Sequence, residues 1–332
     1  MTKHYTELAE KVNAQAVLAR AAILQMTTLS GSGHPGGSMS SIDVLLSIYN
    51  TMRHDPANPQ WNERDRMVVS CGHLSPAVYS TLGLMNYFSL EDAISQFRVY
   101  GSIFEGHIER DVPGVEWSTG NLGQGLSAAV GFAMASRIHG IDNYTYVLMG
   151  DGEQQKGQLS EARRFAAKYK LHKIIAVVDY NQLQISGSIH DVMPQNIRKN
   201  WESDGWQVLE VNGHDVSLIL STLDAARQAD APVMILAHTV MGKGVSFMEN
   251  KAKYHGSTLN DEHCLNALGE LDVPSKLDQY RKAREAYQKN KPVHAIHEFS
   301  PKFDLQPGKP MLYASDSDCR SAWGNAIADL AK

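Results

Sequence analysis

Residues 145–184 read TYVLMGDGEQQKGQLSEARRFAAKYKLHKIIAVVDYNQLQ, and two short apolar runs in this stretch flank a helical pattern. Residues 146–149 and 174–178 have the length and composition of buried strands. Between them lie apolar residues at three- and four-residue spacing, namely Leu159, Ala162, Phe165, Ala166 and Tyr169. These residues predict a helix with one apolar face. The stretch therefore predicts a βαβ unit with two parallel strands.

Polar residues follow each predicted strand. Gly150-Asp151-Gly152 comes after the first strand, and Asn181, which we expect to be exposed, comes after the second. If the strands are neighbours, their ends lie about 5 Å apart. One hard cation such as Mg²⁺ could then bind the Asp151 carboxylate, the Asn181 amide oxygen and a backbone carbonyl near Leu183.

Gly-Asp-Gly alone is most simply a turn. Asn181 in the matching place after the next strand favours a site for a metal and a diphosphate instead. The flanking glycines let the backbone approach a phosphate closely, and the start of the following helix attracts anions.

Similar patterns continue along the chain. Further strands are predicted at residues 67–70, 207–211 and 233–237, and further helices at residues 5–28, 41–52, 124–138 and 215–228. Apolar strands that alternate with helices predict an α/β fold, in which a parallel β-sheet is flanked by helices on both faces.

The pattern changes near residue 290. We expect one domain over residues 1–290 and a linker over residues 291–317, which holds Pro292, Pro301, Pro307 and Pro310. Residues 318–332 contain a short amphipathic helix. This last segment is predicted to be a docking helix or the start of another domain.

Composition excludes several classes of protein. The 332 residues (36.7 kDa) are 43% hydrophobic and 20% charged, which is typical of globular chains and not of disordered ones. The net charge of −5 gives no support to a nucleic-acid partner, and no apolar stretch is long enough to cross a membrane. The polar first residues and three widely spaced cysteines predict a cytoplasmic protein without a disulfide framework.

The Gly150-Asp151-Gly152 motif with Asn181 resembles the thiamine-diphosphate-binding motif, and the longer sequence resembles the transketolases. Loops similar to those of the family follow in order at residues 32–37, 64–66 with 71–73, 106–107, 119–125 and 254–256. The resemblance runs from about residue 5 to residue 260. It covers the family's first domain, which binds the diphosphate, and implies the thiamine diphosphate-binding fold.

The resemblance implies three sets of site residues. Mg²⁺ would be held by Asp151, Asn181 and the carbonyl of Leu183. Thiamine diphosphate would be contacted by His73, Gly120, Leu122, Gly152, Asn181 and His255. The sugar hydroxyls and proton transfer would be served by His34, His107 and His255, because imidazole titrates near neutral pH.

The resemblance also implies a reaction and a partner. The reaction would be transfer of a two-carbon ketol unit between sugar phosphates, as in the pentose phosphate pathway. The family's activating glutamate lies in a second, pyrimidine-binding domain, which we expect on a partner chain, with two copies of each chain related by two-fold symmetry. Lys156 stands where the family usually has an acidic residue at its subunit interface.

Other functions remain open at this point. A dihydroxyacetone synthase or a deoxyxylulose-phosphate synthase would use the same cofactor motif, although residues 34–36 and 254–256 favour a transketolase over the latter. A non-catalytic cofactor-binding or assembly module is a third alternative, which Lys156 and the expected location of the second domain on another chain motivate. The sequence does not name the donor and acceptor sugars, or tell a natural subunit from a part of a longer protein.

Overall fold

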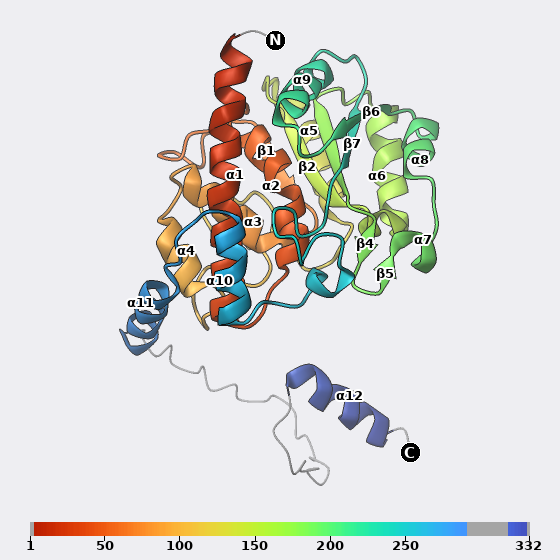
Figure 1. The fold of residues 1–332 in the computed structure, drawn as a ribbon. Helices are drawn as coiled ribbons and strands as arrows, with labels where there is room; N and C mark the ends of the chain where they lie inside the picture. Colours follow the sequence, from red (N-terminus) through yellow and green to blue (C-terminus); the bar gives the residue numbers. More distant parts are fainter. Residues whose placement is uncertain (1–2, 291–317, 331–332) are drawn as a thin grey trace, which may run out of the picture. The chain divides into compact units, whose positions relative to one another are not determined.

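The chain divides into two units, residues 1–290 and 291–332. The computed structural model describes residues 3–290 and 318–330 (Figure 1), so the predicted linker at residues 291–317 lies outside the described residues. The first unit contains the sheet and every predicted site residue. Each unit is described separately below.

A five-stranded parallel sheet forms the centre of the first unit. Its strands lie in the order β1-β2-β3-β7-β6. They comprise β1 (Arg66–Val69), β2 (Thr145–Gly150), β3 (Ile174–Tyr180), β7 (Val233–His238) and β6 (Gln207–Asn212). The predicted βαβ unit is confirmed, because β2 and β3 are parallel neighbours with Gly150 opposite Asp179.

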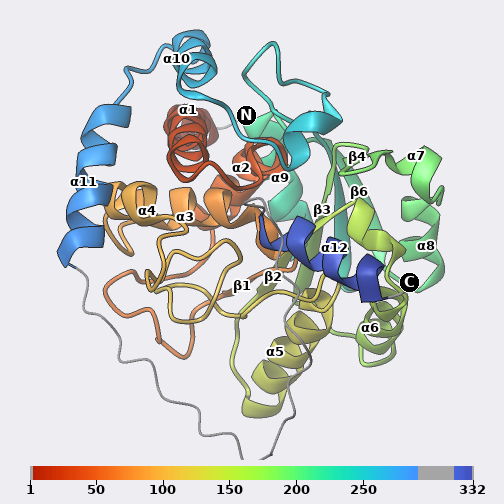
Figure 2. The same ribbon diagram turned by 90° about the horizontal axis from the view of Figure 1, so that it is seen from below.

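Helices cover both faces of this sheet (Figure 2). One face is covered by α1 (Lys3–Ser30), α2 (Pro35–Tyr49), α3 (Ser75–Leu84) and α9 (Val216–Arg227). Three further helices pack against α1, namely α4 (Leu90–Gln96), α10 (Asp261–Glu270) and α11 (Leu277–Asn290). The other face is covered by α5 (Gly125–His139), α6 (Gly157–Lys168) and α8 (Ile197–Ser203). The predicted α/β fold with helices on both faces is confirmed.

Alternation along the strands explains the two layers. In β2, Tyr146 and Leu148 join the core beneath α1 and α2, whereas Val147 and Met149 join the core beneath α5 and α6. Successive side chains of a strand point to opposite faces, so a wholly apolar strand needs a helical layer on each side.

Short elements gather at the carboxyl edge of the sheet. They are η1 (Gly72–Leu74) after β1, η2 (Gly152–Gln155) after β2, and the β4 (Leu183–Gln184)–β5 (Gly187–Ser188) hairpin after β3, which leads into α7 (Ile189–Val192). The 3₁₀ helix η3 (Ala252–His255) contacts β4 and α2. Most of the predicted site residues lie on these elements or directly beside them.

The start of α2 differs from the prediction of residues 41–52. The helix begins at Pro35 and ends at Tyr49, since proline suits the first helical position and needs no hydrogen-bond partner there. Glycine at position 36 lets the first turn approach Tyr254 closely, because a Cβ atom at Gly36 would lie 2.6 Å from the Tyr254 carbonyl oxygen. Because the first turn contains two glycines, a prediction based on apolar side chains did not include it.

Two glycine-to-alanine substitutions test this packing. Gly36→Ala is expected to lower the free energy of unfolding by about 1–3 kcal/mol, because the added methyl group meets backbone that must move. Gly131→Ala, on the exposed side of α5 with no atom within 4 Å of the new Cβ, is expected to raise it by about 0.5–1 kcal/mol. Urea unfolding of both variants measures the difference, and equal effects would contradict the close contact.

The described part of the second unit is a single helix, α12 (Cys319–Leu330), close to the predicted bounds. Its Trp323 and Ile327 side chains are 69% and 48% exposed.

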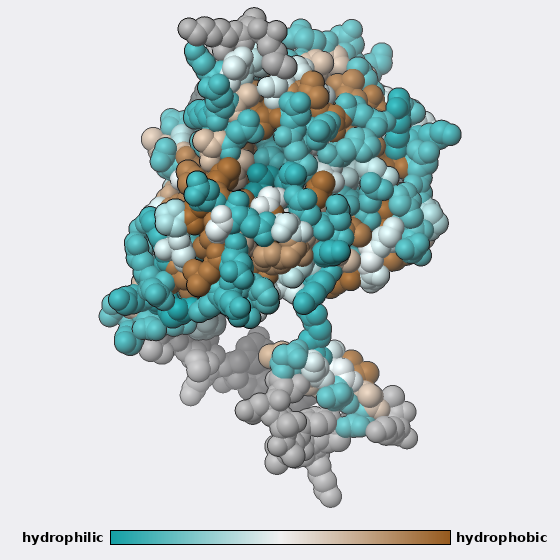
Figure 3. Space-filling view, viewed as in Figure 1, coloured by the Kyte–Doolittle hydropathy of each residue, from teal (hydrophilic) through white to brown (hydrophobic). Residues whose placement is uncertain are grey.

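Across the residues that the structure describes, no helix is long and apolar enough to span a membrane. Figure 3 shows one face of the molecule, where apolar side chains occur in patches among a larger hydrophilic area.

Candidate functional site

A cavity of about 480 Å³ opens at the carboxyl ends of β1, β2, β3 and β7. Seven of the predicted site residues line it, namely His73, Leu122, Asp151, Gly152, Asn181, Leu183 and His255. His34 lies beside the cavity, in ring contact with His73 and His255, and His107 is in ring contact with His34. Gly120 is exposed in the neighbouring loop with φ +146° and is not among the lining residues. The structure therefore brings together nearly all of the predicted site.

Asp151 and Asn181 meet through the backbone of the turn after β3. Asp151 Oδ2 accepts a hydrogen bond from Gln182 N at 2.5 Å, and Oδ1 accepts one from Gly152 N at 2.6 Å. Asn181 Oδ1 accepts one from Leu183 N at 3.0 Å. The expectation that Asn181 is exposed is wrong, because its side chain is buried against the end of β3. Backbone N–H groups thus fix both oxygen-bearing side chains in the wall of the cavity.

A second buried acid, Asp179, was not predicted from the sequence. Its carboxylate accepts hydrogen bonds from Ser40 Oγ at 2.6 Å, from Asn181 Nδ2 at 3.0 Å and from Thr239 Oγ1. The bond from Asn181 Nδ2 to Asp179 orients the amide, so that its Oδ1 faces Leu183 N in the turn after β3. A charged residue near the end of an otherwise apolar strand was the signal that could have revealed this role.

Burial disfavours the charge on these acids. Burial, with the nearby Asp179 carboxylate as the second cause, raises the pKa of Asp151 to about 7. Burial also raises the pKa of Asp179, although its three hydrogen-bond donors oppose this. A cation bound at Asp151 would offset the cost of the charge, so the electrostatics of the cavity favour a metal ion there.

Four histidines form a cluster, two of which, His73 and His255, line the cavity. The His34 ring centroid lies 5.0 Å from that of His73, 5.6 Å from that of His255 and 6.5 Å from that of His107. Burial lowers the pKa of His73 well below its ordinary value, and the three other imidazoles add to this. Burial likewise lowers the pKa of His255 and of His107. Neutral imidazoles can both donate and accept hydrogen bonds, as proton transfer to a sugar hydroxyl requires.

Arg98 holds the loops that carry His34 and His107, and sequence reasoning missed it. Its Nη1 donates to Ser32 Oγ at 2.8 Å, while its backbone N donates to the Phe104 carbonyl at 2.8 Å. A Cβ atom on Gly106 would lie 2.5 Å from the guanidinium carbon. Arg98 adopts a left-handed φ of +54°, which a non-glycine residue adopts only where its surroundings enforce it.

Glu153 is a third buried acid at the cavity, and it too was missed. Its Oε1 accepts hydrogen bonds from Gly123 N at 2.8 Å and from Ser70 Oγ, and its Oε2 accepts one from Gly150 N at 3.1 Å. Burial raises its pKa to about 7, although these donors and Lys156 act in the opposite direction. Lys156 itself is exposed, lines the cavity and donates from Nζ to Asn121 Oδ1 at 3.4 Å.

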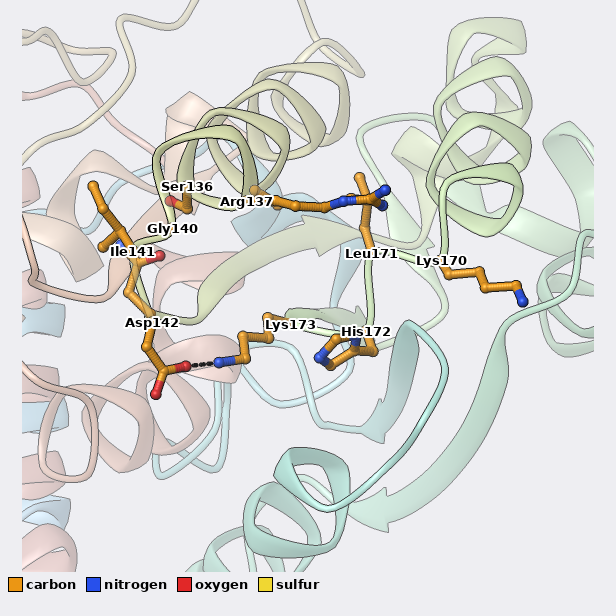
Figure 4. A pocket seen from close by; sticks show the side chains of 11 residues that line it. Ser136, Arg137, Gly140, Ile141, Asp142, Lys170, Leu171, His172 and Lys173 are labelled. Carbon is orange, nitrogen blue, oxygen red and sulfur yellow. Dashed lines mark ion pairs between the residues drawn. The ribbon is translucent and has the colours of Figure 1, made fainter.

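A second hollow, of about 260 Å³, lies at the opposite edge of the sheet, between the ends of α5 and α6 (Figure 4). Lys173 and Asp142 form an ion pair there, and Arg137 donates to the Tyr169 carbonyl. None of the predicted site residues lies in it. The cavity at the carboxyl edge is therefore the candidate site.

The residues of that cavity fit a metal ion and thiamine diphosphate. Asp151, Asn181 and the backbone at Leu183 offer the sparse oxygen set that suits Mg²⁺. Among the described residues, no group of three or more His, Cys, Asp or Glu side chains forms an alternative metal site. His255 Nδ1 is buried without a hydrogen-bond partner among these residues, so the cavity holds a polar atom that a bound anion could satisfy.

Comparison with known proteins agrees with this geometry. Residues 9–276 match the family model for the thiamine diphosphate binding domain of transketolase. The chain is 39% identical over 262 residues to the 6-deoxy-6-sulfo-D-fructose transketolase subunit of Clostridium sp. (strain MSTE9), covering 78% of this chain and 95% of that one. It is 39% identical over 267 residues to an apulose-4-phosphate transketolase subunit of Phocaeicola vulgatus, covering 79% and 94%.

Solved structures share the fold. The crystal structure of transketolase from Campylobacter jejuni superposes with a TM-score of 0.76 and 33% identity, and covers 87% of this chain. The match spans 48% of that transketolase, whereas it spans nearly all of the two relatives named above. By sequence, fold and site geometry, this chain belongs to the transketolase family, as its amino-terminal, thiamine diphosphate-binding part.

Proposed function

We propose that the chain is the diphosphate-binding subunit of a two-chain transketolase, which transfers a two-carbon ketol unit between sugar phosphates. One observation carries this proposal: a single cavity is lined by the Asp151–Asn181 pair and by His73 and His255, two members of a cluster of four histidines. Residues 1–290 would form the diphosphate-binding domain. The family membership supports the reaction, and the matched lengths of the two subunit relatives support the division into two chains.

Each set of residues has a separate task in this proposal. Asp151, Asn181 and the Leu183 carbonyl would hold Mg²⁺, while Gly152, His73 and His255 would bind the diphosphate. Leu122, with Gly120 in the same loop, would contact the rings of the cofactor. Thiamine diphosphate, when bound, supplies the carbanion chemistry that breaks and forms the carbon–carbon bond.

The histidines would handle the sugar. His34 and His107 would hydrogen-bond to sugar hydroxyls and move protons at their ring nitrogens, with His255 adjoining both the diphosphate and the sugar. The lowered pKa values of His107 and His255 keep these imidazoles neutral near pH 7. A neutral ring can accept a proton from a hydroxyl and return it, which an imidazolium cannot do.

The partner would supply the pyrimidine-binding domain. We propose two copies of each chain related by two-fold symmetry, because a cofactor held between chains needs both to complete its site. We also propose that the protein is cytoplasmic and that its reaction belongs to the pentose phosphate pathway. The three free cysteines, Cys71, Cys264 and Cys319, support a reducing compartment.

A ketol-transfer assay tests the function. The full chain is mixed with a candidate partner that carries a pyrimidine-binding domain, thiamine diphosphate and Mg²⁺, and transfer from a ketose phosphate to an aldose phosphate is measured. We expect transfer in the mixture and none with either chain alone. Cofactor binding without turnover on any donor would instead favour the non-catalytic module.

The donor panel identifies the sugar. It includes a ketose phosphate, a 6-deoxy-6-sulfo ketose and apulose 4-phosphate, since two relatives are named for the latter two sugars. Formaldehyde is added as the acceptor that would yield dihydroxyacetone. The ketose phosphate named first is the expected donor. Preference for another member of the panel would keep the reaction and correct the substrate.

A further inference from the structure

The loop of residues 119–124, here called the Leu122 loop, forms one wall of the cavity through Leu122. The loop has little support from regular structure, because it lies before α5 and contains Gly120 and Gly123 with φ of +146° and +90°. Hydrogen bonds and packing contacts from other segments must therefore fix the position of the loop relative to Asp151. Thr119 at its start is bonded to the Ile108 carbonyl, whereas Asn121 and Gly123 contact the segment directly after Asp151.

Glu153 makes the central contact of this loop. Its side chain is 2% exposed, and its Oε1 accepts the Gly123 N–H at 2.8 Å, directly after Leu122 in the chain. Its Oε2 accepts the Gly150 N–H at 3.1 Å, directly before Asp151. One carboxylate thus joins the loop to the end of the strand that carries Asp151.

Ser70 and Lys156 complete the arrangement. Ser70 Oγ donates to Glu153 Oε1 and accepts the Gly125 N–H at 3.0 Å, which ties the start of α5 to the end of β1. The stem of Lys156 packs on Gly123, where an added Cβ atom would lie 2.8 Å from the Lys156 Cβ. Glu153 and Lys156 therefore both contact Gly123.

We propose that Glu153 is the positioning residue of the Leu122 loop, and that its carboxyl group sets the distance between this wall and Asp151. The inference rests on the proposed function only where it calls the cavity the cofactor site. The two oxygens of Glu153 accept one backbone N–H each from the two segments that the residue joins.

The same pattern makes Glu153→Gln a discriminating change. If the new amide nitrogen replaces Oε1 it faces the Gly123 N–H, and if it replaces Oε2 it faces the Gly150 N–H. Either orientation leaves one backbone donor without an acceptor in a buried place. The substitution preserves shape and volume, so its effect reports on the hydrogen bonds.

Hydrogen exchange on the full chain without cofactor measures the first effect. We expect exchange in the peptide over residues 119–125 to become about tenfold faster or more in Glu153→Gln. Exchange in α1 should not change, and the same substitution at exposed Glu262 should leave the loop as in the wild type. Unchanged exchange in the loop of Glu153→Gln would overturn the inference.

Cofactor binding in the mixture with the partner measures the second effect. We expect the Kd of thiamine diphosphate to rise about tenfold or more, with the KM of the sugars unchanged. A merely destabilised variant would lower the active fraction and leave both constants as they were, which would contradict a positioning role. If the wild type binds no cofactor, the proposed function fails, while the exchange measurement still tests Glu153.

A second variant covers the case in which Glu153→Gln does not fold. Ser70→Ala removes one donor from Glu153 and the acceptor of the Gly125 N–H, but leaves the bonds to Gly123 and Gly150. We expect faster exchange at the start of α5 and a smaller increase in the Leu122 loop. If exchange in Ser70→Ala equals that of the wild type both at the start of α5 and in the Leu122 loop, the proposed role of Glu153 is overturned.

Discussion

Replacing Asp151 with Asn is expected to weaken Mg²⁺-dependent binding of thiamine diphosphate by about 100-fold or more. The substitution removes the charge that would hold the cation, a loss of about 2.7 kcal/mol at that fold-change. It also places an NH₂ group against the N–H of Gly152 or Gln182, which both donate to the carboxylate. Titration of thiamine diphosphate into the assembled complex at saturating Mg²⁺ measures the change.

Two controls separate a lost ligand from a lost fold. The same substitution at exposed Asp230 should leave the affinity unchanged. Urea unfolding of Asp151→Asn without Mg²⁺ should show a folded chain, because burial already disfavours the charge of Asp151 and raises its pKa to about 7. Wild-type affinity in Asp151→Asn would refute the assignment of Asp151 as the metal ligand.

Replacing His34 with Ala is expected to lower kcat by about 10²–10⁴-fold, the usual contribution of a general acid–base group. His34 lies at the centre of the four histidines, within 5.0–6.5 Å of the other three rings. Because it lies beside the cavity and not among its lining residues, the affinity for thiamine diphosphate should change little. Steady-state kinetics and cofactor titration on the same preparation measure both.

His190→Ala serves as the matched control, since His190 is exposed in α7 and lies outside the predicted site. It should retain the wild-type kcat. A loss of cofactor affinity in His34→Ala equal to its loss of kcat would assign His34 to the diphosphate and not to the sugar.

Much of the fold followed from apolar periodicity. The strands and the long helices were predictable because wholly apolar runs such as residues 174–178 need two covering layers. The pattern was less informative where packing is made by small residues, as in the first turn of α2. It also overestimated the buried face of α6, where Leu159 and Ala166 are buried but Phe165 is 42% exposed.

The site was predictable where residues carry a recognisable spacing. Asp151 and Asn181 follow adjacent strands, so the topology alone brings them together. Asp179, Glu153 and Arg98 were not predictable in this way, because their roles depend on donors and loops far away in the sequence. Ser40, for example, lies 139 residues from the Asp179 carboxylate that it contacts.

Titration of thiamine diphosphate into this chain mixed with a pyrimidine-binding partner, with and without Mg²⁺, tests the central claim most directly. We predict saturable binding in the presence of Mg²⁺, with loss of that binding when the metal is chelated and marked weakening when the partner is omitted. Absence of thiamine diphosphate binding in the complete, Mg²⁺-containing mixture would contradict the claim that this chain provides the metal and diphosphate half of the cofactor site.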